Sequence, residues 1–120
     1  MQKWLISANP DNFNHAAFLA EYGWIDWNKK NNYEIGDIVY IYNTKTSKVM
    51  FKTYVEKCSS RKNTDDDWVI FRLIEYIDND DLSLEHLRKH GLKNPESKAI
   101  KVVDELGKYL DNYFKKDSKI

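Results

Sequence analysis

The sequence predicts a single α+β domain over residues 1–120, built on a curved, mainly antiparallel, barrel-like β-sheet flanked by helices. Three observations predict this class. A strand-like run and a helical segment come first, three consecutive β-type runs fill the middle, and helical patterning returns at the end. Consecutive strands pair as hairpins, and the flanking helices cover the sheet. A chain of 120 residues supports one hydrophobic core and needs no second domain.

The first predicted strand is the apolar run Trp4-Leu5-Ile6-Ser7, which ends at Asn9-Pro10 because proline cannot continue a central ladder. A helix is expected near residues 12–22, where apolar side chains share one helical stripe. Asn12 is the expected N-cap, and Gly23 is the expected stop.

The next segment is expected to be a loop and is the first candidate binding site. Trp24 and Trp27 precede the polar run Asn28-Lys29-Lys30-Asn31-Asn32, and the segment has no helical or strand patterning that would bury both rings. Exposed rings beside amides and amines suit a flat ligand.

Three strands are predicted in the centre of the chain, over 38–42, 49–56 and 68–76. The first follows a turn at Gly36-Asp37 and consists of β-branched and aromatic residues, which is typical of a strand covered on both faces. Polar segments separate the three runs, so we expect them to be antiparallel neighbours.

The last third of the chain is expected to return to helices. A short helix is predicted from Ser83, with Gly91 as its stop, and an edge strand over 99–102. Val103 to Tyr113 step at helical spacing, and residues 115–120 are predicted to be a frayed tail.

The charge balance excludes a protein that binds nucleic acid mainly through phosphates. Lys and Arg number 19, Asp and Glu number 19, and the formal net charge is zero. A basic excess supplies most non-specific affinity for DNA or RNA, so a nucleic-acid role must depend on a local patch or pocket. The single Cys58 cannot form an internal disulfide, and no run has the length of a signal or a membrane span. We therefore expect a cytoplasmic protein without membrane contact.

Metal binding and nucleophilic catalysis lack the necessary groups. The three histidines, His15, His86 and His90, have no cysteine or third partner nearby for a tetrahedral site, so no metal or cofactor is expected. A thiolate at Cys58 would need a base or a positive microenvironment, and nothing in the sequence requires one. A non-catalytic binding domain is the resulting expectation.

One enzymatic alternative stays open. Asp81 followed by Glu96-Ser97-Lys98 has the spacing by which metal-dependent nucleases hold a divalent ion against a phosphate. A small nucleic-acid-processing enzyme is therefore a second hypothesis. A third is a protein-interaction domain that uses an exposed aromatic patch.

The aromatic and polar residues favour recognition of a nucleobase. The chain contains 4 Trp and 8 Tyr, more than a core of this size requires. A base taken out of its stack can lie between aromatic faces while hydroxyl and amide groups read its edge and lysines hold its phosphates. The candidate ligand-binding residues are Ser7, Asn9, Trp24, Trp27, Asn31 and Tyr42, with Lys29 and Lys30 as a phosphate-binding rim.

The sequence resembles an EVE domain at several places in the same order. These are the runs Trp4 to Pro10, Gly23 to Trp27, Gly36 to Tyr42, Leu87 to Leu92 and Leu106 to Leu110. The resemblance covers nearly the whole chain. Where the longer EVE pattern has an Arg-Asn-rich segment, this chain has Asn28-Lys29-Lys30-Asn31-Asn32.

The resemblance implies a PUA-like pseudo-barrel, related to the YTH, ASCH and SRA-type readers, with a pocket that accommodates a modified base in several of them. Ser7 and Asn9 would then lie beside that pocket, Trp27 or Trp24 would supply its ring, and Tyr42 would close it. The implied partner is modified DNA or RNA, with a restriction or defence protein as a second partner. These residues are expected to converge at one end of the sheet.

Overall fold

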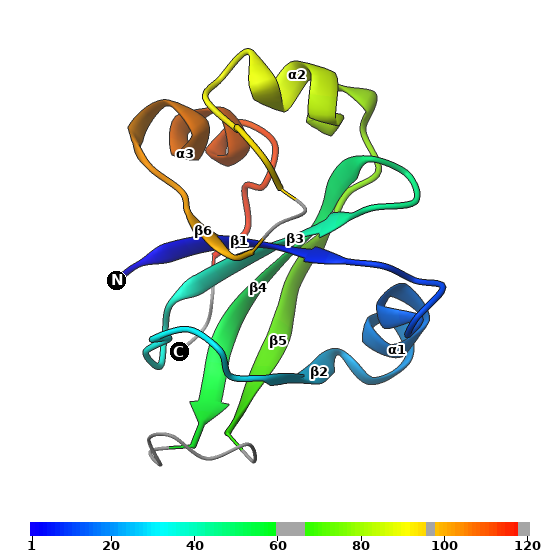
Figure 1. Ribbon diagram of the computed structural model, residues 1–120, viewed down its shortest axis with the longest axis vertical. Helices are drawn as coiled ribbons and strands as arrows, with labels where there is room; N and C mark the ends of the chain where they lie inside the picture. The colour runs from blue at the N-terminus through cyan, green and yellow to red at the C-terminus, as the bar shows by residue number, and fades with distance from the viewer. Residues whose placement is uncertain (60–66, 96–97, 118–120) are drawn as a thin grey trace.

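The computed structural model describes residues 1–59, 67–95 and 98–117, and these form one twisted sheet with helices packed around it (Figure 1). The strands are β1 (Lys3–Ala8), β2 (Trp24–Asn28), β3 (Ile38–Asn43), β4 (Lys48–Cys58), β5 (Trp68–Tyr76) and β6 (Ile100–Lys101). The helices are α1 (His15–Tyr22), the 3-10 turn η1 (Asp80–Leu82), α2 (Leu84–Arg88) and α3 (Asp104–Asp111).

The sheet has six strands in the order β2-β5-β4-β3-β1-β6. The predicted antiparallel neighbours β3, β4 and β5 are confirmed, and β2 and β6 add antiparallel strands at the two ends. Only the pairing of β1 with β3 is parallel among the described strands. The α+β class with a mainly antiparallel sheet is therefore confirmed.

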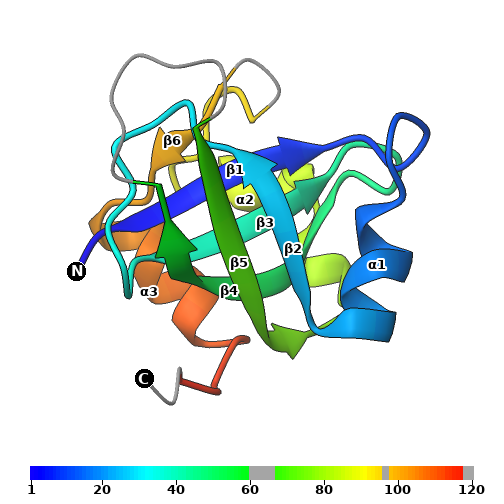
Figure 2. The ribbon, with the colours of Figure 1, turned by 90° about the horizontal axis from the view of Figure 1, so that it is seen from below.

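The sheet curls because its longest strand bends. β4 has 11 residues, and its register with β5 shifts between Lys52 and Thr53 and again between Val55 and Lys57. Such bulges bend a strand and increase its twist. In Figure 2, β5 and β2 accordingly run across the direction of β1 and β3.

Two hydrophobic clusters occupy the two faces of this curved sheet, and β3 contributes to both because all six of its residues are buried. Val39 and Ile41 pack into the first cluster, with Leu19 of α1 and Phe71 of β5. The alternate residues of β3 face the second cluster, which α2 and α3 cover with Leu87, Leu106 and Leu110. The prediction that this strand is covered on both faces is confirmed.

The first helix begins later than the sequence suggested. Asn14, and not Asn12, is its N-cap, and its side chain accepts a hydrogen bond from the Ala17 amide. Asn12 instead donates its amide to the Asn9 carbonyl in the turn after β1. Gly23 ends the helix as predicted, with a positive φ of 75° and its amide bonded to the Leu19 carbonyl.

The prediction of a loop was wrong for residues 24–28, which form β2. Ile25 is fully buried in the first cluster and pairs in register with Phe71, so the segment alternates like a strand on the edge of the sheet. The short length of the run concealed this period of two. The polar residues 29–32 continue without regular structure apart from a bend.

A buried carboxylate fixes the turn before β3. Asp37 is 1% exposed and accepts hydrogen bonds from the amides of Gln2 and Glu34 and from the indole Nε1 of Trp4, at 2.9, 3.0 and 3.1 Å respectively. Gly36 adopts a φ of 93°, which a side chain would strain. The turn thereby joins the start of β1 to the start of β3.

The C-terminal part follows the predicted order. Ser83 precedes α2, but its hydroxyl lies 2.9 Å from His86 Nδ1 and makes no cap bond to the backbone. In the segment predicted to fray, Lys116 accepts a hydrogen bond from Lys52 Nζ and donates its amide to Glu75, while 118–120 lie outside the described residues. No helix in the described ranges is long and apolar enough to span a membrane.

Candidate functional site

A pocket of about 390 Å³ lies where residues of β1 and β2, which do not pair with each other, meet the segment that leads into β6. We refer to this junction as the seam of the curved sheet. The volume of the pocket falls within the range of small-ligand sites. We call it the seam pocket. It is lined by Ile6, Ser7, Trp27, Asn28, Lys30, Asn31, Tyr33, Pro95, Lys98 and Ala99.

The aromatic wall of the seam pocket rests on the first core cluster. Trp27 is half-buried, with its ring centroid 6.1 Å from that of Phe71. Tyr33 is buried, and its ring meets those of Trp4 and Phe71 edge-on at 5.0 and 5.5 Å. Because core residues support both rings, the wall is held in place before any ligand binds.

Two hydrogen bonds orient the polar groups of the pocket. The Asn31 side-chain nitrogen donates to the Tyr33 hydroxyl at 3.2 Å, and the Ser7 hydroxyl donates to the Pro95 carbonyl. Burial raises the pKa of Tyr33, and the Asn31 bond opposes this only in part, so the phenol keeps its proton. Asn31 and Ser7 keep free acceptor positions, and Tyr33 keeps a donor.

The pocket is locally basic in a chain of zero net charge. Lys30 and Lys98 line it, and its described lining contains no carboxylate. Neither lysine has an ion-pair or hydrogen-bond partner among the residues that the structure describes. Both ammonium groups can therefore meet an anion such as a phosphate.

Of the eight residues predicted for the site, the structure brings four together in the seam pocket. These are Ser7, Trp27, Lys30 and Asn31.

The other four lie elsewhere, so the prediction that all of them converge was wrong. Tyr42 is fully buried in the second cluster, on the face covered by the C-terminal helices. Trp24 packs edge-on against Phe18 of α1, 5.4 Å away. Lys29 donates to the carbonyl of Ser59, the residue after β4, at 3.0 Å. Asn9 closes a turn by accepting from the Asp11 amide.

Six lining residues were not predicted for the site from the sequence, and of these Tyr33 and Lys98 carry the most chemistry. Tyr33 had a usable signal, because it is the aromatic residue directly after the polar run 28–32. No signal in the sequence marks Lys98 as a pocket residue, because its position depends on how the segment before β6 crosses the end of β1. Asn28, Ile6, Pro95 and Ala99 complete the missed set.

The residues of the enzymatic alternative do not gather at one described place. The Asp81 carboxylate accepts from the Tyr113 hydroxyl at 3.0 Å, in the layer of α2 and α3, whereas Lys98 lines the seam pocket. Glu96 lies outside the described residues. No group of three potential metal ligands occurs within the described ranges.

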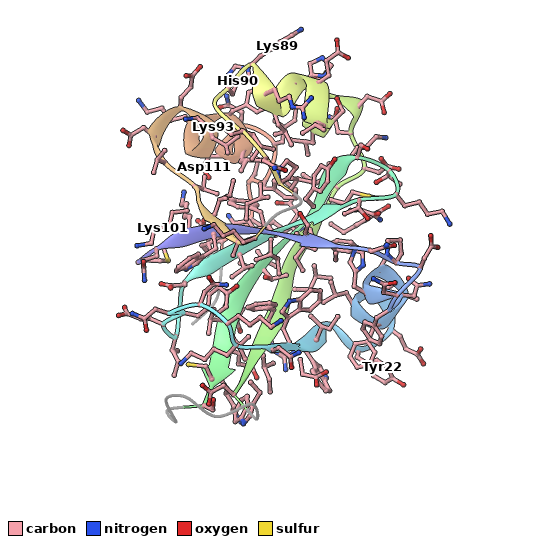
Figure 3. The ribbon with its side chains drawn as sticks, in the orientation of Figure 1. Tyr22, Lys89, His90, Lys93, Lys101 and Asp111 are labelled. Carbon is pink, nitrogen blue, oxygen red and sulfur yellow. The ribbon has the colours of Figure 1, made fainter. Side chains whose placement is uncertain are left out.

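The histidines contribute nothing to the seam pocket. His15 is fully buried against Phe51, with a ring distance of 5.7 Å. His90 stacks on Tyr109 at 3.9 Å and lies in the helical layer away from β2, as Figure 3 shows.

No protein-family model matches the chain, and no curated protein matches it. Solved structures share its fold. ASCH from Zymomonas mobilis is 15% identical, with 93% of this chain and 95% of that chain covered and a TM-score of 0.68. PSPTO5229 from Pseudomonas syringae is 13% identical, with 90% of this chain and 96% of that chain covered. Rpa0253 from Rhodopseudomonas palustris is 10% identical, with 96% of this chain and 94% of that chain covered, and both structures have a TM-score of 0.68. The chain thus shares the fold of these solved structures, while the sequence resemblance to EVE domains and other PUA-like readers stays a prediction.

Proposed function

We propose that the seam pocket binds a nucleobase of DNA or RNA, a modified one, and that the domain does so without catalysis. The observation that carries the proposal is the lining itself. It joins an indole, amide and hydroxyl groups and two lysines in one concave site. This combination suits a flat heterocycle attached to a phosphate chain.

Stacking and edge recognition would come from different residues. Trp27 offers a supported ring on which a base can stack, and such stacking contributes roughly 1–3 kcal/mol per base. Asn28 and Asn31 can both donate to and accept from a base edge. The Ser7 hydroxyl, which already donates to Pro95, would act as an acceptor.

The preference for a modified base is supported by the apolar part of the lining. Ile6, Pro95 and Ala99 stand in the same pocket as the amides. Apolar side chains next to hydrogen-bonding groups favour a methyl group on the base edge, as they do for the thymine methyl in DNA recognition. The sequence resemblance to PUA-like readers points the same way.

The proposal that the domain is not an enzyme is supported by what lines the pocket. No His, Asp, Glu or Cys belongs to its described lining, and the Ser7 hydroxyl donates to the Pro95 carbonyl and not to a basic side chain. A module that binds without reacting fits a role of directing a partner, such as a restriction or defence nuclease, to modified nucleic acid.

Fluorescence anisotropy of labelled single-stranded hexamers tests the proposal. The hexamers carry cytosine, 5-methylcytosine, adenine or N6-methyladenine, as DNA and as RNA. We expect weak binding with a preference for one modified base. Trp27→Ala should weaken it about tenfold or more.

Trp24→Phe is the matched control, because Trp24 packs on α1 and does not line the pocket. Thermal melting of both variants checks that they fold. Equal affinity of Trp27→Ala and the wild type, or no binding of any hexamer at millimolar protein, would contradict the proposed function.

A further inference from the structure

Three residues of the seam pocket also line a second hollow beside it. Trp27, Asn28 and Lys30 form one side of this hollow, which has a volume of about 400 Å³. Phe13, from the segment between β1 and α1, and Asp26 of β2 complete it. We call it the outer hollow. The two cavities adjoin across Trp27, Asn28 and Lys30.

We propose that the outer hollow binds the neighbouring nucleotide of the same single strand, an inference that rests on the proposed function of the seam pocket. The second base stacks on Phe13, its exocyclic amino group donates to Asp26, and the linking phosphate meets Lys30. The domain would then read a two-nucleotide step and not an isolated base.

Phe13 has the surroundings of a stacking platform. Its side chain is 51% exposed although it is large and apolar. Its ring leans on Phe18 of α1 with centroids 5.7 Å apart, which supports it from one side and leaves the other side open. Base stacking on such a ring tolerates any base, so Phe13 supplies affinity and little selectivity.

Asp26 supplies the selectivity. It follows the buried Ile25 on the edge strand, so the alternation of the strand turns it outward. In the described part of the chain, its carboxylate has no ion-pair or hydrogen-bond partner. Carboxylates accept hydrogen bonds from exocyclic amino groups, which adenine, cytosine and guanine carry and thymine and uracil lack.

Lys30 stands where the two nucleotides would be joined. It lines both cavities and has no partner among the described residues, so its ammonium group can meet the phosphate between the two bases. Two successive bases can reach two separate cavities only if both leave a helical stack, which selects single strands.

The test uses hexathymidylates that carry one N6-methyladenine or one 5-methylcytosine, with adenine or thymine on its 5′ or its 3′ side. Anisotropy titrations with the full chain give the affinities. On one of the two sides, the strand with adenine should bind about tenfold tighter than the strand with thymine. Adenine donates a hydrogen bond to the Asp26 carboxylate there, and thymine has no amino group to do so.

Two variants separate the roles. Asp26→Thr should abolish the preference for adenine and leave the thymine-flanked strand within about twofold of wild type. Phe13→Ala should weaken both strands about fivefold or more and leave binding of the single modified nucleoside monophosphate unchanged. Tyr22→Ala is the matched control, since Tyr22 is a 54% exposed aromatic residue that does not line the hollow. It lies at the end of α1 (Figure 3).

The outcomes distinguish the two proposals. If Trp27→Ala weakens binding but flanking bases, Asp26→Thr and Phe13→Ala make no difference, the two-nucleotide inference is wrong and the seam pocket stands. If no hexamer and no monophosphate binds, the proposed function itself is wrong.

Discussion

Replacing the buried Asp37 should cost more stability than any surface change, and the structure allows the size of the effect to be worked out. Its carboxylate is 1% exposed and accepts from the amides of Gln2 and Glu34 and from Trp4 Nε1. Asp37→Ala removes both acceptor oxygens and leaves these three donors without their partner. Trp4 is itself buried, so its N–H has no access to water afterwards.

The orphaned indole N–H costs about 1–3 kcal/mol, and the two partly buried amides, which water can reach, cost about 1 kcal/mol each. The sum is roughly 3–5 kcal/mol in the free energy of unfolding. Domains of this kind are stable by about 5–15 kcal/mol, so the variant should fold but denature much earlier. Asp37→Asn keeps one acceptor oxygen and should lose less.

Urea denaturation followed by circular dichroism measures the effect. Asp26→Asn is the control, since its carboxylate has no partner in the described ranges, and it should stay within about 0.5 kcal/mol of wild type. A double-mutant cycle with Trp4→Phe should show coupling, because both changes remove the same bond. A loss below about 1 kcal/mol for Asp37→Ala would refute the reasoning about this turn.

Four further substitutions test other parts of the fold. Burial lowers the pKa of His15 from 6.5, so the unfolded chain takes up a proton more readily than the folded chain. The free energy of unfolding should therefore fall as the pH drops below about 6.5, and His15→Leu should flatten this slope in denaturation curves. Gly23→Ala should destabilise by about 1 kcal/mol because its φ is 75°, whereas Gly107→Ala inside α3, where the nearest atom to a new Cβ is 3.7 Å away, should stabilise by about 0.5–1 kcal/mol; thermal melts showing the same sign for both would contradict this. Tyr42→Phe should raise the melting temperature or leave it unchanged, and leave hexamer affinity unchanged, because the buried hydroxyl has no partner among the described residues.

Periodicity predicted the central strands because their apolar runs are long. Those over 38–42, 49–56 and 68–76 match β3, β4 and β5 within a few residues. The five-residue β2 is too short for its alternation to stand out, and it forms because β5 offers it an edge and the core accepts Ile25. That information lies in tertiary contacts and not in the local sequence.

The partial success of the site prediction has a geometric cause. Once 24–28 is a strand, Trp24 and Trp27 are an odd number of residues apart and point to opposite faces; Trp24 packs against Phe18 of α1, and Trp27 lines the pocket. The prediction that Tyr42 lines the pocket was wrong for a related reason. Every residue of β3 is buried, so the sequence gives no sign of which face Tyr42 occupies, and the structure places it in the second cluster.

The position of the seam pocket follows from the strand order. β2 and β6 are the two ends of the sheet, and curling brings residues of β2 near β1 and the segment before β6 without pairing them. An edge left unpaired is normally a liability, and here side chains of β2, of β1 and of the segment before β6 line a cavity beside the β2 edge. The parallel pairing of β1 with β3 holds β1 at this seam, and the Ser7 bond to the Pro95 carbonyl ties the crossing segment to it. A ligand at the seam would therefore contact β1, β2 and the segment before β6 at once, so binding there should also stabilise the curled sheet against unfolding.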